Sequence, residues 1–194
     1  MKDTACMNIV LASASPRRRK ILSDLGYRFE VVPSRAEEES LAGETPGDHV
    51  MRLSSIKAEA VALDYPGDLV IGADTAVVLE NEILGKPESE EEAVRMLERL
   101  SGRTHTVYTG LALVHLEGNI KRSGYDTTEV TFNELAANRI REYVSSGEPL
   151  DKAGSYGIQG IGSFLVKSYS GELDTVIGFP SGLFKKMYEE VAPV

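Results

Sequence analysis

The sequence predicts an α/β protein in which a mixed β-sheet is flanked by helices. Short apolar runs that suit buried strands alternate with stretches whose apolar residues recur every three or four positions, as in amphipathic helices. Residues 104–132 also contain two long alternating runs joined by Gly118-Asn119, which is typical of an antiparallel strand pair. With 194 residues, the chain fits a single domain, residues 1–194, with two lobes around a central cleft.

The first strand and helix are predicted on either side of a serine-rich turn. Residues 9–11 have the length of a buried strand, and a helix is expected to begin at Pro16. Ser15 suits the N-cap, proline suits the first helical position, and Gly26 lies where the helix would end. Residues 27–32 alternate in hydropathy and stop before a proline, so we expect a second strand there.

A second helix and a strand hairpin are predicted in the middle of the chain. The helix covers residues 46–63, because Thr45 begins a capping-box pattern. Residues 68–75 form a short apolar strand with Asp74 at its C-terminal end, where ligands and catalytic groups gather in α/β folds. A hairpin is expected over residues 76–84. The spacing places four side chains on one face of the helix: Val50, Leu53, Lys57 and Val61.

The second half of the chain is expected to hold the long strand pair and further helices. A helix over residues 89–100 begins with the capping box of Ser89 and Glu92, and strands follow over 104–116 and onward to Phe132. The remaining elements are a helix capped by Asn133 that carries Ala136, Ile140, Tyr143 and Val144, closing strands at 164–166 and 175–177, and a final helix with Leu183, Phe184, Met187, Tyr188 and Val191 on its apolar face.

Composition and charge argue against several classes of protein. A net charge of −9 and a pI near 4.9 are unlike a general nucleic-acid binder, which has a broad basic face. No apolar run approaches the roughly 18 residues of a membrane span, residues 1–8 lack the layout of a signal peptide, and Cys6 is the only cysteine. The three histidines are too dispersed for a zinc site. We therefore expect a cytoplasmic protein without membrane or nucleic-acid partners.

Residues 13–20, Ser-Ala-Ser-Pro-Arg-Arg-Arg-Lys, place basic side chains at a predicted helix N-terminus. This end of a helix prefers acids because of the helix dipole, so cations there do not serve helix stability. Backbone N–H groups and guanidinium forks together suit an anion, most simply a phosphate chain. A solvated basic turn and a nucleic-acid contact are the alternatives. The acidic net charge favours a small anionic ligand.

Acidic and basic residues further along the chain extend this hypothesis. Glu37-Glu38-Glu39 is either solvated surface or a source of magnesium ligands, since hard cations take oxygen ligands. Lys57 lies in an apolar helix stripe, from which it either snorkels to water or meets a phosphate. Asp74, followed by Lys86, suggests a metal–phosphate centre. In a glycine-rich stretch, Gln159 can donate and accept hydrogen bonds and is a candidate for contacting a base edge.

Seven motifs follow one another along the chain: residues 11–18, 37–38, 52–53 with Lys57, 72–75, 85–87, 100–102 and 151–160. In this order they resemble the Maf family, nucleotide pyrophosphatases of the ITPase-like superfamily. The resemblance covers essentially the whole chain. Some motifs are weak individually, but the ordered set is highly specific.

The resemblance implies an elongated, twisted ITPase-like sheet and hydrolysis of a nucleoside triphosphate to its monophosphate and pyrophosphate. It also implies a divalent metal, most simply Mg²⁺ with Mn²⁺ or Co²⁺ as alternatives, and a homodimer. Asp74 matches the catalytic acid and proton acceptor of the family. The other matching polar positions are Ser13, Arg18, Glu38, Lys57 and Lys86, and Ser15 is expected to join them in binding substrate.

These residues suggest a division of labour. Arg18, Lys57 and Lys86 are expected to clamp the phosphates. Glu38 and Asp74 are expected to hold the metal. Asp74 would orient or deprotonate the attacking water. Which of the two carboxylates is the metal ligand and which is the base stays open.

Three positions that differ between Maf subfamilies indicate the base. Arg17, Thr75 and Gln159 match the Arg, Thr and Gln of the subfamily that acts on dTTP and UTP, whereas the 7-methyl-GTP subfamily has Trp, Gln and Glu. The resemblance therefore implies removal of dTTP, UTP and modified pyrimidine nucleotides from the nucleotide pool. Two alternatives stay open: a nucleotide-binding regulator linked to septum formation and cell-division arrest without turnover, and a pyrophosphatase for a purine such as ITP or 7-methyl-GTP.

Overall fold

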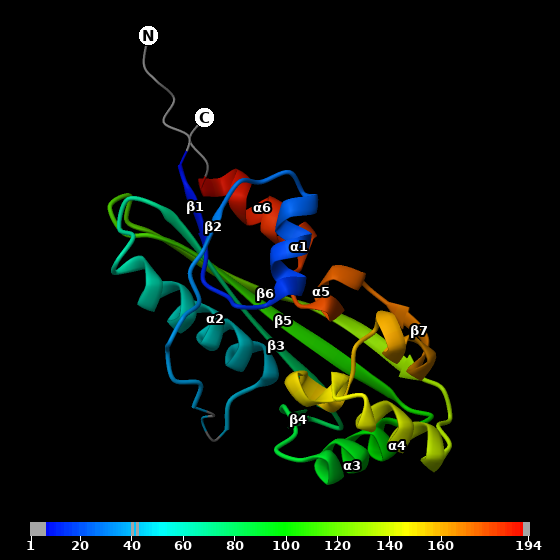
Figure 1. The fold of residues 1–194 in the computed structure, drawn as a ribbon. Helices are drawn as coiled ribbons and strands as arrows, with labels where there is room; N and C mark the ends of the chain where they lie inside the picture. Colours follow the sequence, from blue (N-terminus) through cyan, green and yellow to red (C-terminus); the bar gives the residue numbers. More distant parts are fainter. Residues whose placement is uncertain (1–6, 40, 42, 192–194) are drawn as a thin grey trace. The chain divides into compact units, whose positions relative to one another are not determined.

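The computed structural model describes residues 7–39, 41 and 43–191 and contains a mixed β-sheet with helices (Figure 1). Within this part of the chain, the strands pair in the order β2-β1-β3-β5-β6-β7, with β4 paired to β3. The pairing is parallel between β1 and both β2 and β3, and antiparallel at β3–β4 and β6–β7. The predicted fold class is confirmed. Cys6 lies outside the described residues. The strands are β1 (Ile9–Leu11), β2 (Glu30–Val31), β3 (Leu69–Leu79), β4 (Glu82–Leu84), β5 (Thr104–His115), β6 (Ile120–Phe132) and β7 (Val166–Ser170).

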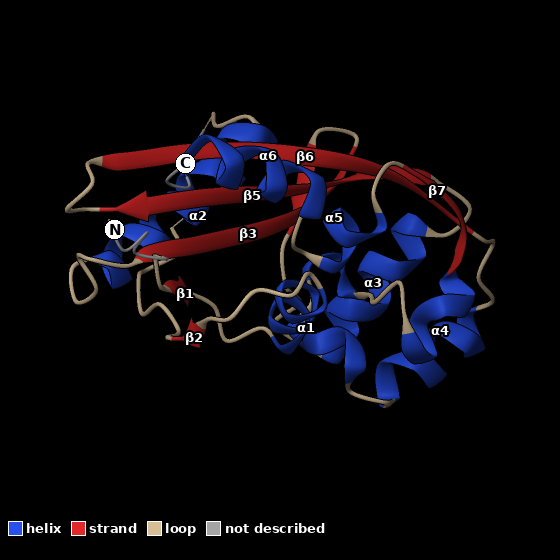
Figure 2. Ribbon diagram, turned by 90° about the horizontal axis from the view of Figure 1, so that it is seen from above, coloured by secondary structure: helices blue, strands red, loops and turns tan. Residues whose placement is uncertain are grey.

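Helices are interspersed among the strands along the chain, and Figure 2 distinguishes the two by colour. None of the described helices combines the length and the hydropathy that a membrane span requires. The α-helices are α1 (Pro16–Asp24), α2 (Pro46–Ala62), α3 (Glu90–Leu100), α4 (Ala137–Ser145), α5 (Leu173–Ile177) and α6 (Ser181–Val191). The 3₁₀-helices are η1 (Glu148–Asp151), η2 (Ala153–Ser155) and η3 (Gly160–Leu165).

The chain divides into two compact units. Unit 1 comprises the described residues up to Asp74, Thr109–Asp126 and those from Gly178 onward. Unit 2 comprises Thr75–Tyr108 and Thr127–Ile177. Strands β3, β5 and β6 contribute residues to both units.

In unit 1, α2 lies directly against the strands because two strand residues lack a side chain. A Cβ at Gly72 would lie 2.1 Å from the Ser54 carbonyl oxygen, and one at Gly110 would lie 2.2 Å from that of Val50. Figure 1 shows α1 and α6 on the opposite side of these strands from α2. The core beneath α2 consists of Val10, Ala12, Val70, Ala112 and Val114 together with Ala58, Val61 and Ala62 of the helix.

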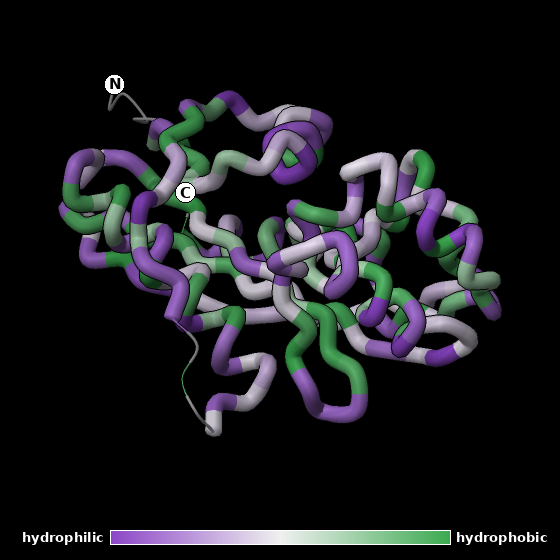
Figure 3. The backbone as a smooth tube through the Cα atoms, turned by 60° about the horizontal axis from the view of Figure 1, so that its bottom comes forward, coloured by the Kyte–Doolittle hydropathy of each residue, from purple (hydrophilic) through white to green (hydrophobic). Residues whose placement is uncertain are grey.

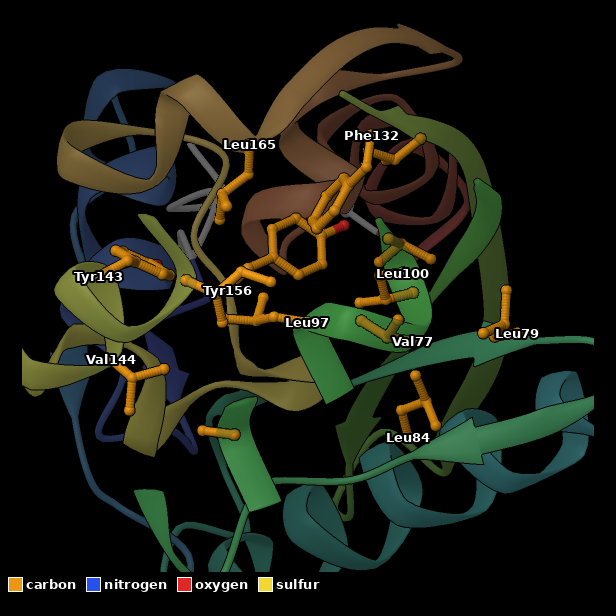
Figure 4. Close-up of a cluster of buried hydrophobic side chains, with 14 residues drawn as sticks. Val77, Leu79, Leu84, Leu97, Leu100, Phe132, Tyr143, Val144, Tyr156 and Leu165 are labelled. Carbon is orange, nitrogen blue, oxygen red and sulfur yellow. The ribbon is translucent and has the colours of Figure 1, made fainter. Parts of the chain in front are cut away.

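Unit 2 has an apolar core of its own. Figure 4 shows Phe132 and Tyr156 side by side within it, and their ring centroids lie 4.8 Å apart. The β3–β4 hairpin turns at Glu80 and Asn81, which both have positive φ, as in the primed two-residue turns that suit hairpins. Figure 3 shows hydrophobic and hydrophilic stretches following one another along the backbone. The core also includes Val77, Leu79, Leu84, Leu97, Leu100, Tyr143, Val144 and Leu165.

Most of the predicted elements are confirmed. Ser15, Thr45 and Ser89 cap α1, α2 and α3 with their hydroxyl groups, as expected. The predicted face of α2 is buried along its length, Lys57 included. Local capping chemistry and apolar spacing therefore sufficed for these elements.

Two strand predictions are corrected. β2 covers only Glu30–Val31 rather than residues 27–32, because its parallel partner β1 is itself only three residues long. Asp74 lies inside β3 rather than at its end, because the strand continues into the hairpin with β4. However, β1 ends opposite Ile71, so Asp74 still lies beyond the parallel pairing of β1 and β3.

The predictions after Phe132 are wrong in three places. Asn133 does not cap α4, whose N-cap is Ala136, because its side-chain amide donates to the Phe164 carbonyl at 2.9 Å. Residues 175–177 belong to α5 rather than to a strand, so tertiary context overrides their β-branched composition. Residues 164–165 end η3, and the closing strand β7 begins only at Val166.

The contact between α2 and the strands predicts the effect of adding one methyl group. Gly110→Ala places a Cβ against backbone that cannot move without displacing α2, so the free energy of unfolding should fall by about 1–3 kcal/mol or more. Urea unfolding measures this change. Gly85→Ala is the matched control, because its Cβ would have no heavy atom within 4 Å. Equal unfolding midpoints for the two variants would contradict the assigned contact.

Candidate active site

Three residues of unit 1 meet at the ammonium group of Lys57. Its Nζ atom lies 2.7 Å from Oδ1 of Asp74 and 3.0 Å from Oε1 of Glu38. Lys57 is 9% exposed and Asp74 is 7% exposed, whereas 47% of the Glu38 side chain is exposed. One cation is therefore shared by a buried and a half-exposed carboxylate through charge-assisted contacts.

The local sequence of β3 explains how Lys57 reaches Asp74. Successive strand residues face opposite sides of a sheet, so Asp74 faces the same side as Gly72. Gly72 lies against Ser54 and Ala58, on either side of Lys57 in α2. Asp74, two residues after Gly72, therefore faces α2 next to the point where the helix lies closest to the strand. Lys57 does not snorkel to water from the apolar face, because it ends in the contact with carboxylates.

Arg18 of α1 is oriented by two neutral acceptors. Its Nε atom donates to the Gly178 carbonyl at 2.8 Å, and its Nη1 atom donates to Oγ of Ser13 at 3.2 Å. Ser13 Oγ also accepts from the N–H of Ser15 at 3.3 Å. Ser15 in turn caps α1 by accepting from the Arg18 N–H. The turn that precedes α1 thereby holds both its own shape and the guanidinium.

Burial has the largest effect on the pKa of Arg18 and lowers it from the usual 12.5. The negative charge of Asp74 raises this pKa, Arg17 lowers it, and Glu38 raises it. Because the pKa of a guanidinium group starts so high, Arg18 remains a fixed cation at neutral pH. Unit 1 therefore brings Arg18 and Lys57 near two carboxylates, those of Glu38 and Asp74.

The other basic residues of α1 differ in their surroundings. Arg17 is half-buried, whereas Arg19 and Lys20 are exposed. Lys20 Nζ lies 2.8 Å from the carboxylate of Asp24, one helical turn later. Arg19 and Lys20 thus fit the solvated interpretation of this basic stretch.

Glu44, His49 and Arg52, to which the sequence assigned no role, form a cluster that attaches the acidic loop to α2. Arg52 donates two hydrogen bonds to the Glu44 carboxylate, one from Nε and one from Nη2. The Nη2 atom also donates to the Glu39 carbonyl at 2.8 Å. His49 Nδ1 lies 3.2 Å from the same carboxylate. Because Glu39 follows Glu38, Arg52 ties the backbone beside Glu38 to α2. The sequence feature that could have indicated this cluster is the three-residue spacing of His49 and Arg52, which places both on one side of α2, next to Glu44.

Thr75, Lys86 and Gln159 belong to unit 2. Thr75 is half-buried in β3, and Lys86 and Gln159 are exposed. The carbonyl of Gly85 accepts a hydrogen bond from the N–H of Gly154 at 2.9 Å. The segment that carries Lys86 and the glycine-rich stretch that carries Gln159 are therefore joined within this unit.

The two carboxylates that contact Lys57 are candidate ligands for a divalent metal. Within the described ranges, no three His, Cys, Asp or Glu side chains are grouped closely enough to hold a metal ion. The carboxylates of Glu38 and Asp74 do meet at one point. Mg²⁺ is usually bound by one or two carboxylates together with substrate phosphates, so this pair fits a metal that binds with its substrate.

The Glu44 cluster predicts a pH dependence of stability. The hydrogen bond from Arg52 lowers the pKa of Glu44 from 4.5 to about 2, against the opposing effect of burial. Because the pKa is lower in the folded chain, this stabilisation is complete above about pH 4.5 and is lost as the pH falls toward 2. Glu44→Gln should therefore lower the free energy of unfolding at pH 7 and flatten its slope between these pH values. Urea unfolding across this pH range measures both effects.

Glu39→Gln is the control for this prediction, because the hydrogen bond of Glu39 with Arg52 is through its backbone carbonyl and its charge has the smallest of the effects on the pKa of Arg52. It should retain the slope of the unaltered chain. A Glu44→Gln variant that kept the same slope would rule out the assigned pKa shift.

The Maf-like protein family matches residues 8–191. A dTTP/UTP pyrophosphatase of Syntrophus aciditrophicus is 48% identical over 172 residues, which cover 89% of this chain and 84% of that protein. Proteins of the same name are 50% identical in Bacillus cereus strain G9842, over 89% of each chain, and 47% identical in Clostridioides difficile, over 90% of each. The solved structure of Staphylococcus aureus Ham1 aligns with a TM-score of 0.47 and 17% identity, over 66% of this chain and 72% of that one. The match along residues 8–191 shows that this chain belongs to the Maf family.

Proposed function

We propose that this chain hydrolyses dTTP and UTP to the nucleoside monophosphate and pyrophosphate. Membership of the Maf family and relatives named dTTP/UTP pyrophosphatase support the proposal. The observation that carries it is the cluster in which Asp74 and Glu38 share Lys57 within the field of Arg18. A purely structural ion pair needs only one partner for each charge. This arrangement instead collects the cations and carboxylates that phosphoanhydride hydrolysis uses.

The N-terminal end of α1 and the nearby cations bind the phosphate chain. Backbone N–H groups at a helix N-terminus and the helix dipole attract anions. Arg18 is already oriented by Ser13, and Lys57 provides a second fixed cation. Lys86 of unit 2 is exposed and also contacts phosphate in this proposal. These cations stabilise the charge that develops on the departing pyrophosphate.

Water attacks the α-phosphorus, the bond from this phosphorus to the bridging oxygen breaks, and pyrophosphate leaves. Asp74 orients this water or accepts its proton. Glu38 is the other carboxylate in contact with Lys57. Either carboxylate can act as the base while the other contributes to metal binding.

Mg²⁺ is the proposed cofactor, with Mn²⁺ or Co²⁺ as substitutes. Glu38 and Asp74 would hold it together with oxygens of the substrate phosphates. When bound, the metal neutralises charge on the phosphate oxygens. The Arg52 contact to Glu39 supports this role by keeping the backbone next to Glu38 attached to α2.

Arg17, Thr75 and Gln159 select the base in this proposal. Their residue types match the subfamily that acts on pyrimidine nucleotides. The amide of Gln159 can donate and accept, which suits the edge of a pyrimidine. By the same family resemblance, we propose that the chain acts in the cytoplasm as a single-domain protomer of a homodimer.

The proposed function predicts the outcome of an assay on the unaltered chain. Pyrophosphate release is measured with dTTP, UTP, ITP and 7-methyl-GTP in the presence of Mg²⁺. We expect kcat/KM for dTTP and UTP to exceed the values for the purines by about tenfold or more. Replacing Mg²⁺ with EDTA should abolish turnover. Preference for a purine would contradict the base assignment, and no release from any nucleotide would contradict the proposed activity.

Removal of the charge on Asp74 provides a second test. Asp74→Asn should lower kcat for dTTP by about a thousandfold, because the carboxylate is lost from both the water and the metal. A melting curve confirms that the variant is folded before its kinetics are compared. Asp68→Asn is the matched control, since Asp68 is a surface acid that accepts a hydrogen bond from Asn8 at 3.1 Å. A folded Asp74→Asn variant with full activity would show that Asp74 is not catalytic.

A further inference from the structure

Gln159 lies in a loop, residues 157–162, whose last three residues begin η3 and which closes around the hydroxyl group of Tyr143. The N–H of Gly157 donates to this hydroxyl at 3.0 Å, and the hydroxyl donates to Oε1 of Glu148 at 3.0 Å. Tyr143 is 4% exposed and belongs to the unit 2 core, where Figure 4 labels it. Burial raises the pKa of its phenol, which therefore stays protonated and able to donate. One buried hydroxyl thus links the loop to a carboxylate.

The glycines of this loop are placed where side chains would interfere. A Cβ at Gly162 would lie 2.3 Å from the Gly157 carbonyl oxygen and 2.7 Å from the Tyr143 hydroxyl. Gly160 has a φ of 69°, in the left-handed region that favours glycine. The two ends of the loop therefore approach each other at the phenol, with Gln159 in the segment between them. The Tyr143 hydroxyl thus lies against both ends of the loop.

The Tyr143–Glu148 pair is itself held from several sides. Ser146 Oγ accepts from the Glu148 N–H at 3.3 Å and donates to the Tyr143 carbonyl at 2.6 Å. Lys152 Nζ donates to the Glu148 carbonyl. The rings of Tyr143 and Phe164 pack edge to face, with their centroids 5.9 Å apart. The support beneath the loop therefore comes from α4, η1 and η3 together. A rigid support of this kind is what a selective contact needs.

We propose that Tyr143 and Glu148 are positioning residues that set base selectivity by fixing the loop that carries Gln159. This inference rests on the proposed function, in which Gln159 contacts the base. An amide distinguishes one base edge from another only when its donor and acceptor atoms are held in place. Loosening the loop should therefore reduce discrimination between bases. The catalytic groups Lys57 and Asp74 belong to unit 1 and should keep their contacts.

The experiment compares kcat and KM for dTTP and ITP, with Mg²⁺, in the full chain and four variants. Tyr143→Phe removes the hydroxyl, Glu148→Ala removes its acceptor, and Glu148→Gln keeps an acceptor oxygen. The control is Tyr65→Phe, because the Tyr65 hydroxyl also donates to a glutamate, Glu30, at 3.1 Å but in unit 1. This control also removes a hydrogen bond from a tyrosine hydroxyl to a glutamate, but one that lies outside the loop.

We expect Tyr143→Phe and Glu148→Ala to lower the dTTP-to-ITP ratio of kcat/KM by about tenfold, mainly through a higher KM for dTTP. The kcat for dTTP should stay within about threefold of its original value. Glu148→Gln and Tyr65→Phe should keep the original ratio within about twofold. This pattern supports the inference.

A merely structural role for Tyr143 and Glu148 would lower kcat for both nucleotides alike and leave the ratio unchanged. That result, or an equal loss of selectivity in Tyr65→Phe, would overturn the inference. If Tyr143→Phe does not fold by circular dichroism, the comparison of Glu148→Ala with Glu148→Gln decides. Failure of the unaltered chain to release pyrophosphate from dTTP would instead overturn the proposed function, so the two failures can be told apart.

Discussion

The close approach of α2 to the strands is the constraint on which the candidate site depends. Gly72 and Gly110 have no side chain, so the helix backbone lies where a Cβ would otherwise be. Lys57, on the buried face of this helix, consequently reaches Asp74, two residues beyond Gly72. A buried ammonium group is costly unless it is paired, and loss of one partner leaves an uncompensated charge. Core packing and the placement of the charged groups are therefore one structural feature in unit 1.

Local polar contacts then give each charged group a defined orientation. Ser13 and the Gly178 carbonyl orient Arg18, and Arg52 fastens the backbone next to Glu38 to the helix that carries Lys57. The molecule as a whole carries a net charge of −9, so this concentration of cations is a local feature rather than a general basic surface. Such an arrangement suits a small polyanion that brings its own metal, because cationic side chains pair with phosphate oxygens and carboxylates are ligands for a hard metal ion.

Unit 2 uses buried hydroxyl groups to shape its glycine-rich stretch. Tyr156, which precedes Gly157, has its hydroxyl 2.7 Å from Nε2 of His105. Burial lowers the pKa of His105 to about 4, so the imidazole is neutral at pH 7 and its contact with Tyr156 is a neutral hydrogen bond. Together with Tyr143, this contact anchors the stretch from within the core. Glycine thus provides the freedom to turn, and buried aromatic residues provide the order.

The sequence by itself determined the features that depend on neighbours within a few residues. The caps at Ser15, Thr45 and Ser89, the buried face of α2 and the β3–β4 hairpin could all be predicted, because capping chemistry and apolar spacing are local. Family motifs also identified Lys57, Asp74 and Glu38 as candidates. Only the tertiary structure decided that these three meet, that Arg18 binds the Gly178 carbonyl, and that Asn133 binds Phe164 rather than capping a helix. Periodicity reports which face of an element is buried, but the group that covers it lies tens of residues away and is selected by packing.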